Sequence, residues 1–268
     1  MKRVDGHTAR KRFGQNFLVS HGVIQKIISA VAPRDGDTVV EIGPGLGALT
    51  YPLLEHVKHL HVVEIDRDLI ARLRDRVPEE QLSIYEGDAL EFDFSTLKGD
   101  GRLKIVGNLP YNIYSPLLFH LAGFAELVYD MHFMLQKEVV DRMVAAPGSG
   151  DFGRLSVMLQ YRFQMARLFI VPPGSFNPPP KVDSAVVRMI PIDFAKVGAD
   201  STAHDHAHFA KLVATAFSQR RKMLRNTLRE LCTEQQMLDA GITPTARAEE
   251  IGVAEFVRLS NALVRHVA

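Results

Sequence analysis

The chain has 268 residues, 46% of them hydrophobic and 24% charged, which is typical of a globular protein with one substantial domain and a smaller one. Its single cysteine, Cys232, excludes an internal disulfide framework, and no hydrophobic run is long enough to span a bilayer. The net charge of +1 excludes strong overall basicity, although local basic clusters can still attract an anionic partner. The basic N-terminal segment lacks the apolar stretch of a signal peptide, so we expect a soluble, cytoplasmic protein.

Short β-branched runs alternate with helical patterns through the first two-thirds of the chain. Residues 38–42, 61–65, 82–85, 104–107 and 131–136 are predicted strands, and residues 68–76 are a predicted helix. This alternation predicts a mostly parallel sheet with helices on both faces. Ligands of such sheets bind beyond the carboxyl ends of the strands, where the strand order reverses.

The pattern changes after residue 154. Residues 155–171 and 185–192 are long hydrophobic runs separated by a proline-rich loop, which predicts an antiparallel hairpin added to the sheet edge. Small and polar residues then suggest a linker, and hydrophobic side chains beyond it recur at helical spacing. We therefore predict an α/β domain over residues 1–192, a linker over 193–205 and a small α-helical domain over 206–268.

A glycine-rich turn directly follows the first predicted strand. Residues 41–47 have the spacing Glu-x-Gly-x-Gly-x-Gly, with Gly43 and Gly45 in the turn, which differs from the dinucleotide-binding fingerprint. Glu64 ends the second strand, where a carboxylate can accept hydrogen bonds from ribose hydroxyls, and Asp88 follows the third, where it can accept one from an adenine amino group. A single such carboxylate is equally well explained as a helix N-cap. Suitable groups at three consecutive strand ends favour a nucleoside cofactor.

The fourth predicted strand ends in the sequence Asn108, Leu109, Pro110 and Tyr111. The Asn108 side-chain oxygen and the Leu109 carbonyl can accept the two N–H groups of an adenine N6 amine, which favours a tetrahedral nitrogen whose lone pair faces a methyl donor. Pro110 fixes the turn, and Tyr111 can stack on a base taken out of its helix or loop. Positioning would supply most of the rate, without a strong base. By itself, the motif leaves open a strand-terminating turn with a packed tyrosine.

Several motifs together resemble the ribosomal RNA adenine N6-methyltransferase family, in particular its bacterial small-subunit dimethyltransferases. They are residues 13–18 (Phe-Gly-Gln-Asn-Phe-Leu), 41–50, 108–111, 134–138, 176–188 and 219–222. The resemblance covers nearly the whole chain. It implies a Rossmann-like fold, S-adenosylmethionine as cofactor, and dimethylation of two adjacent adenines near the 3′ end of 16S ribosomal RNA in an immature small ribosomal subunit. It also implies that the cofactor is lined by Asn16, Leu18, Gly43, Glu64, Asp88 and Asn108.

The resemblance also bears on two features that the residues alone leave ambiguous. Phe176 precedes three prolines and is either a hydrophobic plug or an aromatic that stacks on the target adenine; the resemblance favours stacking. A basic cluster is either a solvated surface or a phosphate contact; the resemblance favours the contact. The cluster consists of Arg220, Arg221, Lys222 and Arg225.

Other functions remain open. A large-subunit ribosomal RNA methyltransferase conferring antibiotic resistance is one, although such enzymes typically carry isoleucine in place of Leu109. A ribosome assembly factor that acts mainly by binding is another, and a nicotinamide dehydrogenase fits poorly because the glycine spacing differs. His204, His206 and His208 alternate, but a solvated linker is favoured over a metal site, and we expect no metal. Nothing in the sequence demands more than a monomer.

Overall fold

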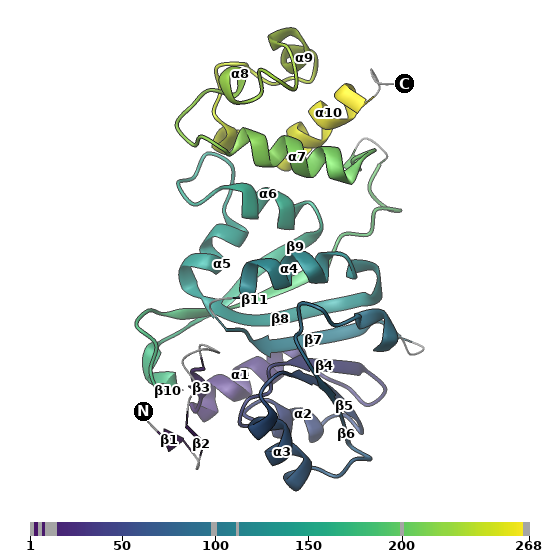
Figure 1. Cartoon of the computed structure of the whole chain (residues 1–268), viewed down its shortest axis with the longest axis vertical. Coiled ribbons are helices and arrows are strands. Elements are labelled where there is room, and N and C mark those ends of the chain that lie inside the picture. Colours follow the sequence, from purple (N-terminus) through teal and green to yellow (C-terminus); the bar gives the residue numbers. More distant parts are fainter. Residues whose placement is uncertain are drawn as a thin grey trace. The chain divides into compact units, whose positions relative to one another are not determined.

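The computed structural model describes residues 15–97, 101–110, 113–198 and 201–264, together with the backbone of β1 (Arg3–Val4) and β2 (His7–Thr8), which pair with each other. The chain divides into two compact units (Figure 1). The first comprises Met1–Val140 and Met165–Pro191, and the second comprises Asp141–Gln164 and Ile192–Ala268. Within the described ranges, no helix combines the length and the apolar character that crossing a membrane requires.

The first unit is built on a seven-stranded sheet with the order β6-β5-β4-β7-β8-β11-β9. Its strands are β4 (Thr38–Ile42), β5 (Leu60–Glu64), β6 (Leu82–Glu86), β7 (Leu103–Asn108), β8 (Val128–Gln136), β9 (Phe163–Val171) and β11 (Ser184–Pro191). The five neighbouring strands β6, β5, β4, β7 and β8 run parallel to one another, and β11 pairs antiparallel with β8. The predicted α/β class is confirmed. The strand order reverses between β4 and β7, so this fold places a ligand beyond the carboxyl ends of these two strands.

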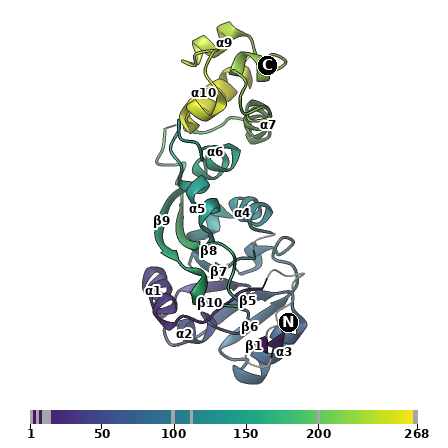
Figure 2. The ribbon, with the colours of Figure 1, turned by 90° about the vertical axis from the view of Figure 1, so that its left-hand side faces the viewer.

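The helices of this unit cover both faces of the sheet. Side chains of α1 (His21–Val31), α2 (Thr50–Leu54) and α3 (Arg67–Arg76) share one hydrophobic cluster with β4, β5 and β7. Helix α4 (Tyr114–Ala122) lies on the opposite side of the sheet from α1 (Figure 2). Strand β4 is buried except at Thr38, which fits a sequence in which every residue but Glu41 is β-branched. The ends of each predicted strand in the parallel part of the sheet differ from those of an observed strand by at most three residues.

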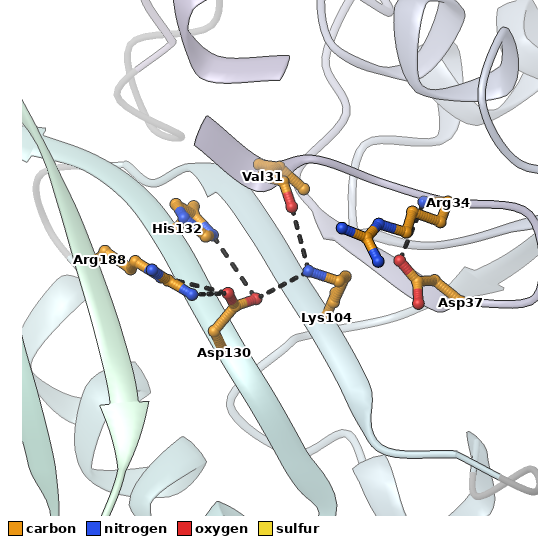
Figure 3. A network of polar contacts seen from close by, with 7 residues as sticks. All are labelled: Val31, Arg34, Asp37, Lys104, Asp130, His132 and Arg188. Atoms are coloured by element: carbon orange, nitrogen blue, oxygen red, sulfur yellow. Dashed lines mark hydrogen bonds and ion pairs between the residues drawn. The ribbon is translucent and has the colours of Figure 1, made fainter. Parts of the chain in front are cut away.

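A buried polar network, here called the Asp130 network, lies on the α1 face of β7, β8 and β11 (Figure 3). Asp130 is 1% exposed, and Arg188 donates two hydrogen bonds to its Oδ2, at 3.2 and 2.8 Å. The Lys104 ammonium lies 3.5 Å from Oδ1 of Asp130 and donates to the carbonyl of Val31, the last residue of α1, at 3.1 Å. The network therefore joins three strands to one helix, and none of it was anticipated from the sequence.

His132 completes this network as a neutral ring. Its Nδ1 lies 3.8 Å from Oδ1 of Asp130, and neither ring nitrogen has a hydrogen-bond partner in the described part of the chain. Burial lowers the pKa of His132 to about 4, and Asp130 opposes this shift while Arg188 and Lys104 reinforce it. The imidazole is therefore uncharged at neutral pH.

The second unit is helical, and it contains a segment that the sequence analysis assigned elsewhere. Its helices are α6 (Arg154–Gln160), α7 (His206–Ala216), α8 (Leu224–Thr227), α9 (Glu234–Asp239) and α10 (Val253–Val264). Residues 155–160 were expected to begin a strand but form α6, because Phe152, Val157 and Tyr161 pack in one cluster with Phe209 of α7. The same packing explains why residues 141–164 group with the C-terminal helices and not with the α/β domain. Helix α5 (Lys137–Val144) follows β8 directly, and the division between the two units falls within it.

The end of the predicted linker is anchored within the second unit. The backbone N–H of Ala203 donates to the Tyr161 hydroxyl at 3.0 Å, and that of His204 donates to Oδ1 of Asn261 at 2.8 Å. Asp205 then caps α7 by accepting from two backbone N–H groups. The three alternating histidines thus flank a helix start, and among the described residues no group of three or more His, Cys, Asp or Glu is placed to hold a metal. Cys232 is buried in the segment between α8 and α9.

Candidate active site

A cavity of about 330 Å³ opens in the first unit at the carboxyl ends of the parallel strands. Every residue expected to bind the cofactor lines it, so the structure brings together groups from four strand ends and from the N-terminal segment. These residues are Asn16, Leu18, Gly43, Gly45, Glu64, Asp88 and Asn108. Leu109 and Pro110 also line the cavity, while Tyr111 lies outside the described residues.

The glycine turn after β4 forms one wall of this cavity. Gly43 and Gly45 have φ angles of 68° and 59°, in the left-handed region that side chains with a Cβ rarely adopt. A Cβ on Gly45 would also lie 3.3 Å from the ring of Phe17. Glycine is required here by the local backbone, and the turn leaves main-chain atoms open to a ligand.

Glu64 presents a carboxylate at the end of β5. Its Oε1 accepts the backbone N–H groups of Ile65 and Asp66, both at 2.9 Å, and its Oε2 lies 3.4 Å from the N–H of Gly45. Burial raises the pKa of Glu64, and these hydrogen bonds partly offset the shift. No basic side chain in the described ranges forms an ion pair with it. Oε2, held by one long contact, is the oxygen best placed to accept from a ligand.

Glu41 is a second buried carboxyl group in the cavity wall, 2% exposed. The Thr50 hydroxyl donates to its Oε2 at 2.7 Å. Burial raises the pKa of Glu41 to about 8; the Thr50 hydrogen bond opposes the shift and the nearby Glu64 adds to it. Glu41 is therefore largely protonated at neutral pH. Its partner Thr50 begins α2, so this pair also fixes the glycine turn between β4 and α2.

Asp66 and Asp88 have local structural roles as well. Asp66 is the N-cap of α3, where its Oδ1 accepts from the backbone N–H of Asp68 at 3.1 Å. Asp88 is half-buried and accepts from the backbone N–H of Leu90 at 2.9 Å. Asp66 is thus a helix N-cap, whereas Asp88 forms a local turn and also lines the cavity.

The end of β7 carries the two candidate acceptors for an amine. The Asn108 side-chain nitrogen donates to the carbonyl of Asn16 at 3.0 Å, which orients the amide and leaves its oxygen as an acceptor. The Leu109 backbone N–H donates to the carbonyl of Met134 in β8 at 3.1 Å. Gly107 precedes them because a Cβ there would lie 2.6 Å from the carbonyl oxygen of Ile42. Close packing of β7 against β4 therefore holds this corner in place.

Phe176, the second candidate stacking residue, is buried in the structure. It belongs to β10 (Phe176–Asn177), which pairs with β3 (Phe17–Leu18), and only 4% of it is exposed. Its ring packs in the same cluster as Leu18, Ile27 and Val171, and it does not line the cavity. Stacking on a base would require this ring to become accessible, so its role in stacking stays a prediction.

The basic cluster of the second unit is divided by its ion pairs. Arg220 pairs with Glu249 at 3.1 Å and donates to the carbonyl of Gly150. Arg225 lies 4.0 Å from Glu234. Arg221 and Lys222 are exposed, and neither has an ion-pair partner among the described residues. These last two are the cations most available to an external anion.

Sequence reasoning missed several lining residues, notably Gln15 and Phe17 from the N-terminal segment, Leu46 and Ile113. Gln15 donates from Nε2 to Oδ2 of Asp66 at 3.0 Å. No periodicity or spacing marks these positions. The only available signal was the resemblance of residues 13–18, which singled out Asn16 and Leu18 but not their neighbours.

The sequence matches the model of a family described as "Ribosomal RNA adenine dimethylase" over residues 6–265. A "Ribosomal RNA small subunit methyltransferase A" from Dechloromonas aromatica is 58% identical over 258 residues, covering 96% of this chain and 99% of the relative. One from Aromatoleum aromaticum is 61% identical over 255 residues, covering 95% and 94%.

Two solved structures share the architecture. A dimethyladenosine transferase from Plasmodium falciparum is 27% identical with a TM-score of 0.76, covering 90% of this chain and 95% of that one. The 23S rRNA methyltransferase ErmE, at 24% identity and a TM-score of 0.68, covers 93% of this chain and 100% of its own, and it supports the Rossmann-like fold alone. The whole-length match to the family model and the identity to the curated relatives lead to one conclusion: the chain belongs to the ribosomal RNA adenine dimethylase family.

Proposed function

We propose that this protein transfers methyl groups from S-adenosylmethionine to N6 of two adjacent adenines in the 3′-terminal hairpin loop of 16S ribosomal RNA, which yields N6,N6-dimethyladenosine. The observation that carries the proposal is the position of the Asn108 amide and the Leu109 carbonyl beside a cavity with carboxylates suited to a nucleoside. The names of the relatives at 58% and 61% identity support the small-subunit substrate.

The lining of the cavity fits this cofactor. The volume of about 330 Å³ lies in the range of small-molecule sites. Glu64 would accept hydrogen bonds from the ribose hydroxyls and Asp88 from the adenine amino group, while Asn16, Leu18, Gly43 and Gly45 would contact the remainder. Glu64, a buried carboxyl group that forms no ion pair with a basic side chain in the described ranges, also suits a ligand that carries positive charge. When bound, the cofactor supplies an electrophilic methyl group on a sulfonium.

The residues at the end of β7 would position the acceptor. The Asn108 side-chain oxygen and the Leu109 carbonyl would accept the two N–H groups of the adenine amine, so that the nitrogen lone pair faces the methyl group. No strong base is needed, because the proton can leave after transfer. Holding the two reactants in line supplies most of the acceleration. We propose that Tyr111 and Phe176 stack on opposite faces of the target base, and that Phe176 leaves its buried position when the base binds.

The experiment that tests this function is mass spectrometry of RNA nucleosides after the protein acts on undermethylated small ribosomal subunits with S-adenosylmethionine. We expect N6,N6-dimethyladenosine to accumulate with small subunits and not with large ones. Methylation of large subunits instead would favour a resistance methyltransferase. Cofactor binding without methylation of either subunit would favour an assembly factor that acts by binding.

Asn108→Ala is the first variant for this assay. Because the acceptor acts on the target amine, its loss should slow methylation strongly while RNA binding is largely retained. A loss of about a hundredfold in kcat is the scale expected for one positioned hydrogen-bonding group. Turnover close to that of the wild type would overturn the assignment of Asn108.

The second unit supports a role in RNA binding through Arg221 and Lys222. Replacing both with alanine should weaken binding to small-subunit RNA and reduce the slope of log affinity against log salt by about 1.5, since each lost phosphate contact lowers it by about 0.7 to 0.9. Lys196→Ala is the control, because Lys196 lies outside the cluster and already pairs with Asp193 at 3.1 Å. An unchanged slope in the double variant would indicate that the cluster is a solvated surface and does not contact phosphates.

We further propose that the substrate is an immature small subunit in the cytoplasm and that the protein acts as a monomer. Its single cysteine is buried and forms no disulfide, which fits a reducing compartment. The substrate's maturity can be tested by comparing methylation of free 16S RNA, assembly intermediates and mature subunits.

A further inference from the structure

Residues 15–18, here called the strap, are held over the cavity at several points. The Gln15 amide donates to Asp66 at the end of β5 at 3.0 Å, and the Asn16 carbonyl accepts from Asn108 at the end of β7, also at 3.0 Å. The last two residues of the strap form β3, which pairs with β10. All four strap residues line the cavity. The strap therefore links the two strand ends that flank β4.

The first of these anchors leads directly to the candidate ribose-binding group. Asp66 is 1% exposed, its backbone N–H donates to Oε1 of Glu64, and its Oδ1 caps α3. Its other oxygen, Oδ2, accepts from Gln15. One buried residue thus fixes the strap, the Glu64 carboxylate and the start of a helix at once.

The second anchor leads to the candidate acceptor for the target amine. The Asn108 amide is oriented by the carbonyl of Asn16, and Asn16 is the residue after Gln15. Phe17 directly follows the two anchored residues; it is 7% exposed, and its ring packs against Gly45 of the glycine turn. A displacement of the strap would therefore disturb the cofactor cavity and the orientation of Asn108 together.

We propose that Gln15 is a positioning residue whose hydrogen bond to Asp66 holds the strap in place, and thereby couples cofactor binding to the orientation of the Asn108 amide. The inference rests on the proposed function. Gln15 acts through Asn16 and Asn108 and needs no contact with the reacting atoms. Loosening its anchor should weaken cofactor binding and slow methyl transfer in the same variant.

The sharpest test replaces the hydrogen-bond donor of Gln15 with an acceptor. Gln15→Glu places a second carboxylate against Asp66, which should raise the Kd for S-adenosylmethionine about tenfold, the effect of about 1.4 kcal/mol, and lower kcat as well. Asp66→Asn should have a small effect, because asparagine also caps helices and the Gln15 amide can rotate to accept from it. The double variant Gln15→Glu with Asp66→Asn restores a donor facing a carboxylate and should recover both constants.

A matched control exists in the second unit. Gln235 donates from Nε2 to Oδ1 of Asp239 at 2.9 Å in an exposed pair on α9. Gln235→Glu introduces the same repulsion there and should leave the Kd for S-adenosylmethionine unchanged.

The outcomes separate this proposal from the proposed function. The Kd is measured by calorimetry with S-adenosylmethionine, and kcat is measured with small subunits. If the wild type binds and methylates but Gln15→Glu changes only the thermal midpoint, the positioning role of Gln15 is overturned and the function stands. If the double variant does not recover the Kd, the Gln15–Asp66 bond is not the cause. Failure of the wild type to bind the cofactor would contradict the proposed function itself.

Discussion

The first unit buries acidic side chains in two places, and it treats them differently. In the Asp130 network, one carboxylate faces Lys104 and Arg188, so its charge is matched within the protein. In the cavity wall, Glu41 and Glu64 accept hydrogen bonds from a hydroxyl and from backbone N–H groups, with no basic partner among the described residues, and burial raises the pKa of both. Both groups of side chains lie in the same sheet, so their different pairing comes from the neighbouring residues and not from the kind of fold.

This difference separates a structural cluster from a binding one. A buried charge with its own counter-charges gains little from an outside ligand and is costly to disrupt. Carboxyl groups held without a basic partner are less stable in the free protein, and a ligand that donates hydrogen bonds or carries positive charge can compensate them. Buried acidity alone therefore does not distinguish the two places; among the described residues, they differ in whether a basic side chain faces the carboxyl group.

The largest expected effect is on the matched cluster. Asp130→Ala leaves the largely buried Lys104 ammonium without its carboxylate, and it should lower the free energy of unfolding by about 3 to 5 kcal/mol. The measurement is denaturant unfolding, with Asp35→Ala as the control, because Asp35 and Lys58 form an exposed pair. The control should cost less than about 1 kcal/mol. Equal effects in the two variants would contradict the structural role of the network.

A smaller effect is expected from pH at the cavity wall. The pKa of Glu41 is raised from 4.5 to about 8, so its contribution to stability is present below pH 4.5 and is lost as the pH rises toward 8. Between about pH 5 and about pH 7.5, the wild type should lose about 3 kcal/mol relative to Glu41→Gln, which does not titrate. Glu55→Gln on the exposed end of α2 is the control. Parallel stability curves for Glu41→Gln and wild type would contradict this assignment.

The smallest effect concerns the uncharged member of the Asp130 network and has the opposite sign. The pKa of His132 is lowered from 6.5 to about 4, so stability is present above pH 6.5 and is lost as the pH falls toward 4. From about pH 7 to about pH 5, the wild type should lose about 2 kcal/mol relative to His132→Phe. Replacement of the exposed His56 by glutamine should leave the acid side of the curve unchanged.

Sequence patterns predicted the features that depend on neighbouring residues in the chain, namely the strands and the positions at which they end. A hydrophobic run followed by a turn fixes both a strand and the place where it ends, so Glu64, Asp88 and Asn108 could be assigned to one edge of the sheet before their contacts were known. Periodicity failed where two element types shared one hydrophobic run, as in residues 155–171, which are divided between α6 and β9.

Contacts between distant segments could not be predicted in this way. Lys104, Asp130 and Arg188 are far apart in sequence, and no motif joins them. The burial of Phe176 depends on its pairing with β3, and the anchor of Gln15 depends on Asp66, 51 residues further along the chain. These are consequences of tertiary packing, which one sequence does not display.

The β-bulge at the start of β8 has a consequence for how this chain tolerates changes in length. Leu103 pairs with Val128 but Lys104 pairs with Asp130, so Tyr129 has no partner in β7. Deleting Tyr129 would make the pairing continuous and leave Asp130 opposite Lys104. Deleting one residue between positions 130 and 134 would instead carry Met134 away from Leu109 and turn the following side chains to the other face. The bulge thus allows the loss of one residue before Asp130, while the five residues from Asp130 to Met134 must keep their number to hold Met134 against Leu109.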